Sequence, residues 1–207
     1  MALPPELLRR VSREEINALP IRRYEGPVSV IAAPEQLAPA MDDILQEKLI
    51  GFDTETRPAF RPGESYPPSL AQLATARAVY LFQVRHAEVA AAVARVLGEA
   101  RIVKTGVSVA DDLKSFKKLI AFHEKSVVDV GLLAQRNGLQ QSGVRNLAGL
   151  LLGFRIPKGT KTSNWARQTL TEQQIVYAAT DAWACRELYL RFEELGLNDA
   201  ERQPTAR

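Results

Sequence analysis

The sequence of 207 residues has almost no cysteine and no long hydrophobic run. Its one cysteine, Cys185, cannot form an internal disulfide or a thiolate cluster, which excludes a disulfide-stapled secreted scaffold and a structural zinc site. The most apolar stretch, 147–154, is far shorter than the roughly 18 residues that a membrane span needs. The opening, MALPPELLRR, lacks the basic head and apolar run of an export signal. We therefore expect a cytoplasmic protein with no membrane partner.

The overall composition is ordinary, but the charge is unevenly spread. With 46% hydrophobic and 25% charged residues, the chain suits one globular domain with short extensions and excludes collagen-like and disordered classes. Acidic residues are missing between Val130 and Thr171. Because this stretch carries only positive charge, it favours a polyanion such as nucleic acid as a partner, provided that the charges form a patch in space. Its basic residues are Arg136, Arg145, Arg155, Lys158, Lys161 and Arg167.

The apolar patterns predict an α/β fold. We divide the chain into an irregular N-terminal arm (1–26), a single domain (27–195) and a loose polar C-terminal tail (196–207). Strands are expected at 28–32, 48–53, 69–74, 78–84, 101–105 and 126–129, and helices at 35–46, 88–97, 111–122, 130–136, 144–152 and 171–195. The second to fourth strands resemble an antiparallel meander, and later strands alternate with helices. This order predicts a mixed sheet, antiparallel and parallel, with helices on its faces.

Two carboxylates stand at the end of an apolar strand, in the sequence Gly51-Phe52-Asp53-Thr54-Glu55. Residues two apart on a strand point to the same face, so Asp53 and Glu55 lie side by side. Like charges that close repel unless a cation or a proton lies between them, and oxygen ligands suit Mg²⁺ or Mn²⁺. The alternative is a solvated strand end with two ordinary surface acids.

A second candidate site lies in the last predicted helix. Tyr177 and Asp181 are four residues apart and share one face, which continues through Ala184, Cys185 and Leu188. Asp181 therefore points inward, where a carboxylate is costly unless it is paired or bound to a metal. For Tyr177 the alternative is a buried tyrosine with one satisfied hydroxyl.

Two aspartates open another predicted helix. Asp112 shares its face with Phe116 and Leu119 and is expected to point inward, whereas Asp111 is expected to face water. For both residues the alternative is an acid that stabilises a helix N-terminus by capping or through the macrodipole, and we favour it for Asp111.

Together these residues resemble a known family. The pattern of four inward carboxylates, with a tyrosine one turn before the last of them, resembles that of the DEDDy 3′ to 5′ exonucleases. This family is the ribonuclease D and Werner-syndrome exonuclease group, which has an RNase H-like fold. The resemblance covers roughly residues 48–190 and includes the segment KTSNWARQTLTEQQIVYAATDAWA. It implies that Asp53 and Glu55 fill the first exonuclease motif, Asp112 the second, and Tyr177 with Asp181 the third. A sister branch has histidine in place of the tyrosine, but His86 and His123 are far from Asp181 in the sequence.

The resemblance also implies a mechanism. Asp53, Glu55, Asp112 and Asp181 would bind two divalent cations, Mg²⁺ or Mn²⁺, which activate a water and stabilise the departing 3′ oxygen. Tyr177 would orient the water or the phosphate, because a phenol with an ordinary pKa near 10 is a weak base. The substrate would be a single-stranded 3′ end of DNA or RNA, and the products nucleoside 5′-monophosphates.

The loop before the last helix is the predicted substrate-binding segment. Phosphates could be held by its basic residues and by Asn164, and Trp165 could stack on a base, although packing of Trp165 onto the domain is the favoured alternative. Two other functions stay open: a phosphodiesterase acting on small oligonucleotides, and a non-catalytic nucleic-acid-binding relative. The predicted substrate-binding residues are Lys158, Lys161, Asn164, Trp165 and Arg167.

Overall fold

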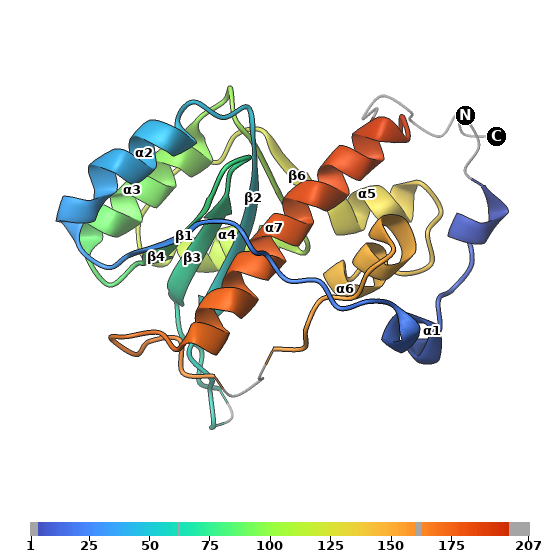
Figure 1. Cartoon of the computed structure of the whole chain (residues 1–207). Helices are drawn as coiled ribbons and strands as arrows, with labels where there is room; N and C mark the ends of the chain where they lie inside the picture. Colours follow the sequence, from blue (N-terminus) through green and yellow to red (C-terminus); the bar gives the residue numbers. More distant parts are fainter. Residues whose placement is uncertain (1–3, 62, 160–162, 199–207) are drawn as a thin grey trace.

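The computed structural model describes residues 4–61, 63–159 and 163–198. A six-stranded sheet in the order β1-β4-β3-β2-β5-β6 forms its centre (Figure 1). The strands are β1 (Val28–Ile31), β2 (Leu49–Thr56), β3 (Pro68–Ala74), β4 (Val79–Gln83), β5 (Val103–Gly106) and β6 (Val127–Asp129). The helices are α1 (Arg13–Ala18), α2 (Leu37–Ile44), α3 (Ala87–Gly98), α4 (Val109–Phe116), α5 (Val130–Arg136), α6 (Val144–Leu147) and α7 (Glu172–Glu194).

The strand pairing confirms the predicted mixed sheet. Strands β2, β3 and β4 pair antiparallel as a meander, whereas β1 pairs parallel with β4, β5 with β2, and β6 with β5. Strand β2 continues to Thr56 instead of ending at Asp53 as predicted, because β3 pairs with it from Gly51 to Thr56. Asp53 and Glu55 therefore lie within the sheet rather than at its end.

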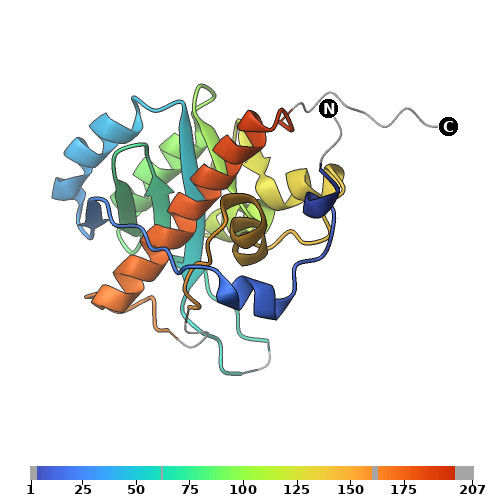
Figure 2. The ribbon, with the colours of Figure 1, turned by 45° about the vertical axis from the view of Figure 1, so that its right-hand side comes forward.

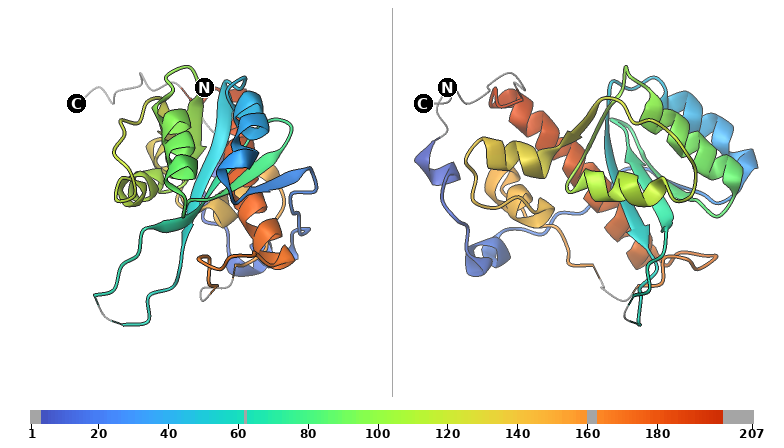
Figure 3. Two further views of the ribbon diagram at one scale, coloured as in Figure 1. Left: turned by 90° about the vertical axis from the view of Figure 1, so that its left-hand side faces the viewer. Right: turned by 180° about the vertical axis from the view of Figure 1, so that it is seen from behind.

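Helices cover both faces of the sheet, as the two sides of the core show. On one face, α2, α3 and α4 pack on apolar residues such as Phe52 and Phe82. On the other face α7 crosses the strands, seen edge-on in Figure 3. This helix approaches the sheet closely at Gly51, where an added Cβ would lie only 1.9 Å from the carbonyl oxygen of Ala182. Glycine is required there because helix backbone occupies the space of a side chain.

Helix α7 starts where its sequence indicates. The Thr171 side chain accepts a hydrogen bond from the backbone of Gln174, and the Gln174 side chain accepts one from the backbone of Thr171, which completes a capping box. Gly196 follows the helix with a φ of +67°, as a residue after a helix end commonly does. Leu197 is buried, so the predicted loose tail does not begin at 196; residues 199–207 lie outside the described part of the chain.

The N-terminal arm is more ordered than predicted. It contains helix α1, which starts with a capping box between Ser12 and Glu15, a signal that the S-x-x-E pattern carries in the sequence. Ile16 of this helix is buried against Gly149. Farther along the arm, the backbone N–H of Arg22 donates to the carbonyl of Arg155 at 2.9 Å. The arm is therefore fixed to the domain, and the prediction of an irregular arm is wrong for 13–18.

Two helices differ in extent from the prediction. Helix α4 begins at Val109 instead of Asp111, directly after Ser108 in a left-handed conformation (φ 59°), and it ends at Phe116 instead of 122. The segment predicted as a helix at 144–152 is α6 followed by a π-helical turn at Ala148–Leu152. None of the described helices is both long and apolar enough to cross a membrane.

Candidate active site

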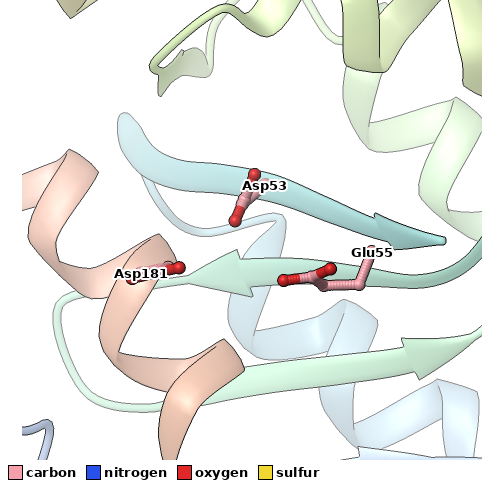
Figure 4. A group of neighbouring side chains, drawn as sticks. All are labelled: Asp53, Glu55 and Asp181. Atoms are coloured by element: carbon pink, nitrogen blue, oxygen red, sulfur yellow. The ribbon is translucent and has the colours of Figure 1, made fainter. Parts of the chain in front are cut away.

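Three of the four predicted carboxylates converge where β2 meets α7. Asp53 and Glu55 project from β2 toward Asp181 on α7 (Figure 4). Each offers a carboxylate oxygen, and these atoms lie within 4.8 Å of one another. The predicted common face of Asp53 and Glu55 is confirmed, and so is the inward position of Asp181, which is 7% exposed.

The carboxylates destabilise one another's charged forms. Burial, followed by the charges of Asp181 and Asp112, raises the pKa of Glu55 to about 8. Burial and the charges of Asp112, Asp181 and Glu55 raise the pKa of Asp53 well above its usual range. Burial also raises the pKa of Asp181, to about 6. Ionising all three carboxylates is therefore costly in this water-poor place, and a bound cation would offset that cost.

The donor set fits a hard divalent cation. All three groups bind through carboxylate oxygens, the ligands that Mg²⁺ and Mn²⁺ prefer, and no thiolate or imidazole belongs to the cluster. Cys185 is buried nearby on α7, but burial raises the pKa of its thiol well above the usual range, so that it stays protonated.

The fourth carboxylate, Asp112, reaches the site from another direction. Strand β5 pairs with β2 only as far as Gly51, which leaves the next residues of this edge open to α4. Asp112 accepts a hydrogen bond from the Thr54 hydroxyl at 2.5 Å and lies close enough to raise the pKa of Asp53. It does not belong to the group of three. Asp111 is exposed, as predicted.

Tyr177 lies beside the cluster. It is half-buried, and burial together with the charge of the nearby Asp181 carboxylate raises its pKa far above the usual range. Its ring packs against Trp165, with ring centroids 6.0 Å apart, and against Gly159, where an added Cβ would lie 2.4 Å from the ring. A cleft of about 470 Å³ borders Tyr177 and Glu55 and gives the site an opening.

The predicted substrate-binding loop divides into buried and exposed parts. Trp165 is 5% exposed and packs in the cluster beneath α7, which agrees with packing rather than with stacking on a base. Lys158, Asn164 and Arg167 are exposed, and Asn164 accepts a hydrogen bond from the backbone of Ala166. Lys161 lies outside the described residues.

The sequence motifs did not predict two residues that lie near the site. Thr54, between the two predicted ligands, holds Asp112. Gln72 pairs with Asp53 across β2 and β3 on the same sheet face, is fully buried, and has no hydrogen-bond partner for either amide atom among the described residues. Its signal was a polar residue inside the apolar run Leu70-Ala71-Gln72-Leu73, which is unusual for a strand buried on both faces.

Comparison with known proteins decides the family. A family model described as 3′-5′ exonuclease matches residues 28–196, most of the chain. The chain belongs to this 3′-5′ exonuclease family. The resemblance to ribonuclease D and the Werner-type exonuclease is thereby confirmed, and with it the RNase H-like fold.

Individual relatives of this exonuclease domain are distant. The exonuclease mut-7 homolog of Aedes aegypti is 26% identical over 199 residues, which cover 84% of this chain and 27% of that protein. The mouse bifunctional 3′-5′ exonuclease/ATP-dependent helicase WRN is 32% identical over 157 residues, which cover 72% of this chain and 11% of that protein. The chain thus spans about a quarter or less of these two relatives.

Solved structures show the same fold. The Nibbler EXO domain of Aedes aegypti has a TM-score of 0.74 at 25% identity, and the match covers 86% of this chain and 92% of that one. Escherichia coli RNase D has a TM-score of 0.69 at 22% identity, over 82% of this chain and 46% of that one.

Proposed function

We propose that this chain is a metal-dependent 3′ to 5′ exonuclease that hydrolyses the terminal phosphodiester bond of single-stranded DNA or RNA and releases nucleoside 5′-monophosphates. One observation supports this most: three carboxylates with raised pKa values converge beside an open cleft, which Glu55 lines, in a chain of the 3′-5′ exonuclease family. The exonuclease domain also retains all four carboxylates that its resemblance predicts, which argues against a non-catalytic relative.

The position of each residue indicates its proposed role. Asp53, Glu55 and Asp181 would hold one divalent cation, and Asp112, next to Asp53, would help to hold a second. Bound divalent cations supply an acidified water and stabilise negative charge on the leaving oxygen. The Thr54 hydroxyl fixes the orientation of Asp112, and the close packing at Gly51 fixes the distance between β2 and α7. These contacts place the oxygens before any ligand binds.

Tyr177 is assigned to orientation rather than to proton abstraction. The pKa of its hydroxyl lies far above neutral pH, so the hydroxyl keeps its proton. In this form it can donate one hydrogen bond and accept another, which orients a ligand without abstracting a proton. The ring is fixed by Trp165 and Gly159, which directs the hydroxyl toward Asp181 and the cleft.

We expect Tyr177→Phe to lower kcat on the order of 10²-fold, the scale of a positioned hydrogen-bonding group, with little change in melting temperature. The substitution removes only the hydroxyl and keeps the ring that packs on Trp165. Tyr189→Phe, on the same helix but outside the site, is the control. Unchanged kcat in Tyr177→Phe would assign this residue to packing alone.

The proposed function is tested by incubating the purified chain with labelled single-stranded DNA and RNA of matched sequence. We expect stepwise shortening from the 3′ end in Mg²⁺ or Mn²⁺, none in excess EDTA, and recovery when the cation is restored. A 3′-blocked strand should resist. Hydrolysis that persists in EDTA, or cleavage within the strand, would contradict the proposal.

A further inference from the structure

A basic pocket lies between the N-terminal arm and α6, which run side by side in Figure 2. We call it the arm pocket. Its volume is about 550 Å³, and the described residues of its lining include four cationic side chains and no acidic one. The cations are Arg10 and Arg13 from the arm, Arg145 from α6 and Lys158 from the loop that follows.

The pocket is built on a fixed frame. The backbone N–H of Val11 donates to the side chain of Gln141 at 2.8 Å, and Ile16 is buried in contact with Gly149. On α1, the Glu15 carboxylate is engaged by Arg9 at 2.6 Å and by the cap at Ser12. Among the described residues the four pocket cations form no ion pair, although the charge of Arg145 acts on Asp181 and its Nη1 is buried without a hydrogen-bond partner. The charges of Arg10, Arg13 and Lys158 are available to a ligand.

The arm pocket adjoins the active site. Lys158 lines both this pocket and a second hollow of about 400 Å³, whose wall includes Tyr177 and Gly159. Tyr177 in turn borders the cleft at Glu55. Shared lining residues thus connect the arm pocket, through Lys158 and Tyr177, to the cleft at Glu55.

We propose that the arm pocket binds the phosphodiester backbone of the substrate strand on the 5′ side of the bond that is cut. The inference rests on the proposed function, because an enzyme that removes the 3′-terminal nucleotide leaves the rest of the strand to extend from the site in the 5′ direction. Four separated cations suit successive phosphates, which are recognised without regard to sequence. Arg10 and Arg13 lie before the matched residues 28–196, so this contribution comes from outside the family's domain.

The test compares two double variants. Arg10→Gln with Arg13→Gln removes two pocket charges and leaves the Ser12–Glu15 capping box intact. Arg95→Gln with Lys125→Gln removes two exposed charges at α3 and beside its end, on the other side of the molecule, and serves as the control. Binding of a fluorescent single-stranded 12-mer is measured in EDTA at several salt concentrations. In Mg²⁺, kcat/KM is measured for the 12-mer and for a dinucleotide.

We expect the arm variant to bind the 12-mer roughly tenfold more weakly and its log Kd against log salt to flatten by about 0.7 for each phosphate that the pocket no longer binds. The kcat/KM ratio of 12-mer to dinucleotide should fall by a similar factor, whereas the control keeps the wild-type slope and ratio. An unchanged slope in the arm variant, or an equal decrease on the dinucleotide, would overturn the inference. Binding in EDTA needs no hydrolysis. A chain that binds the 12-mer but does not cut it would therefore refute the proposed function, whereas the slopes of log Kd against log salt would still show whether the arm pocket binds phosphates.

Discussion

Replacement of Asp53 by asparagine is expected to lower kcat by about 10³-fold or more. The charges of Asp112, Asp181 and Glu55 all act on Asp53, which is the carboxylate proposed to contribute to both cation positions, so its loss weakens both. Stabilisation of transition-state charge by a metal amounts to several kcal/mol, and each 1.36 kcal/mol is a factor of ten in rate. Hydrolysis of a labelled strand in saturating Mg²⁺ measures the loss. Asp42→Asn, an exposed carboxylate on α2, is the control and should turn over normally.

The same variant should be more stable than the wild type when metal is absent. In the folded chain the pKa of Glu55 is raised to about 8, whereas an unfolded carboxyl has a pKa of about 4. The folded state therefore binds more protons between these values, and the free energy of unfolding falls as pH rises from about 4 to about 8. The pKa of Asp53 is itself raised by burial and by the charges of Asp112, Asp181 and Glu55, so Asp53 contributes to this fall in the same way. Asp53→Asn removes that contribution, so the melting temperature of the variant in EDTA should decline less over this range. A steeper decline than in the wild type would contradict the repulsion.

Asp112→Asn is expected to lower kcat on the order of 10²-fold or more, with the fold intact. The variant's amide oxygen can still accept the hydrogen bond from Thr54, so the change is mainly one of charge beside Asp53. Stability in EDTA should be unchanged or improved, because burial and the charges of Asp111 and Asp129 raise the pKa of Asp112 to about 6.

The neighbouring Asp111→Asn is the matched control. Asp111 is exposed in the first turn of α4 and makes no side-chain cap, so only the helix dipole favours its charge. Its replacement should lower the free energy of unfolding by no more than about 1 kcal/mol, with turnover near normal. Measuring kcat and melting temperature for both variants shows which of the two aspartates belongs to the second exonuclease motif. Equal loss of activity in both, or exchanged phenotypes, would reassign the second motif.

Local chemistry explains why so much could be predicted from the sequence. Alternation along a strand put Asp53 and Glu55 on one face, and helical periodicity put Tyr177 and Asp181 on another, without reference to the rest of the chain. Capping-box patterns marked the start of α7 to within two residues, at Thr169 with Glu172 or at Thr171 with Gln174, and the structure forms the second. The S-x-x-E pattern at Ser12 carries the same information for α1, although the arm around it was predicted to be irregular.

What the sequence by itself determined is therefore the set of carboxylates, the tyrosine, and the faces on which they lie. Only the tertiary structure decided that Asp181 meets Asp53 and Glu55, because this depends on how closely α7 approaches β2 at Gly51. It also decided that Asp112 is held by Thr54 at the open edge of β2, and that the arm adds its charges to those of α6. Such placements arise from contacts between residues far apart in the chain, which packing fixes and local periodicity does not encode.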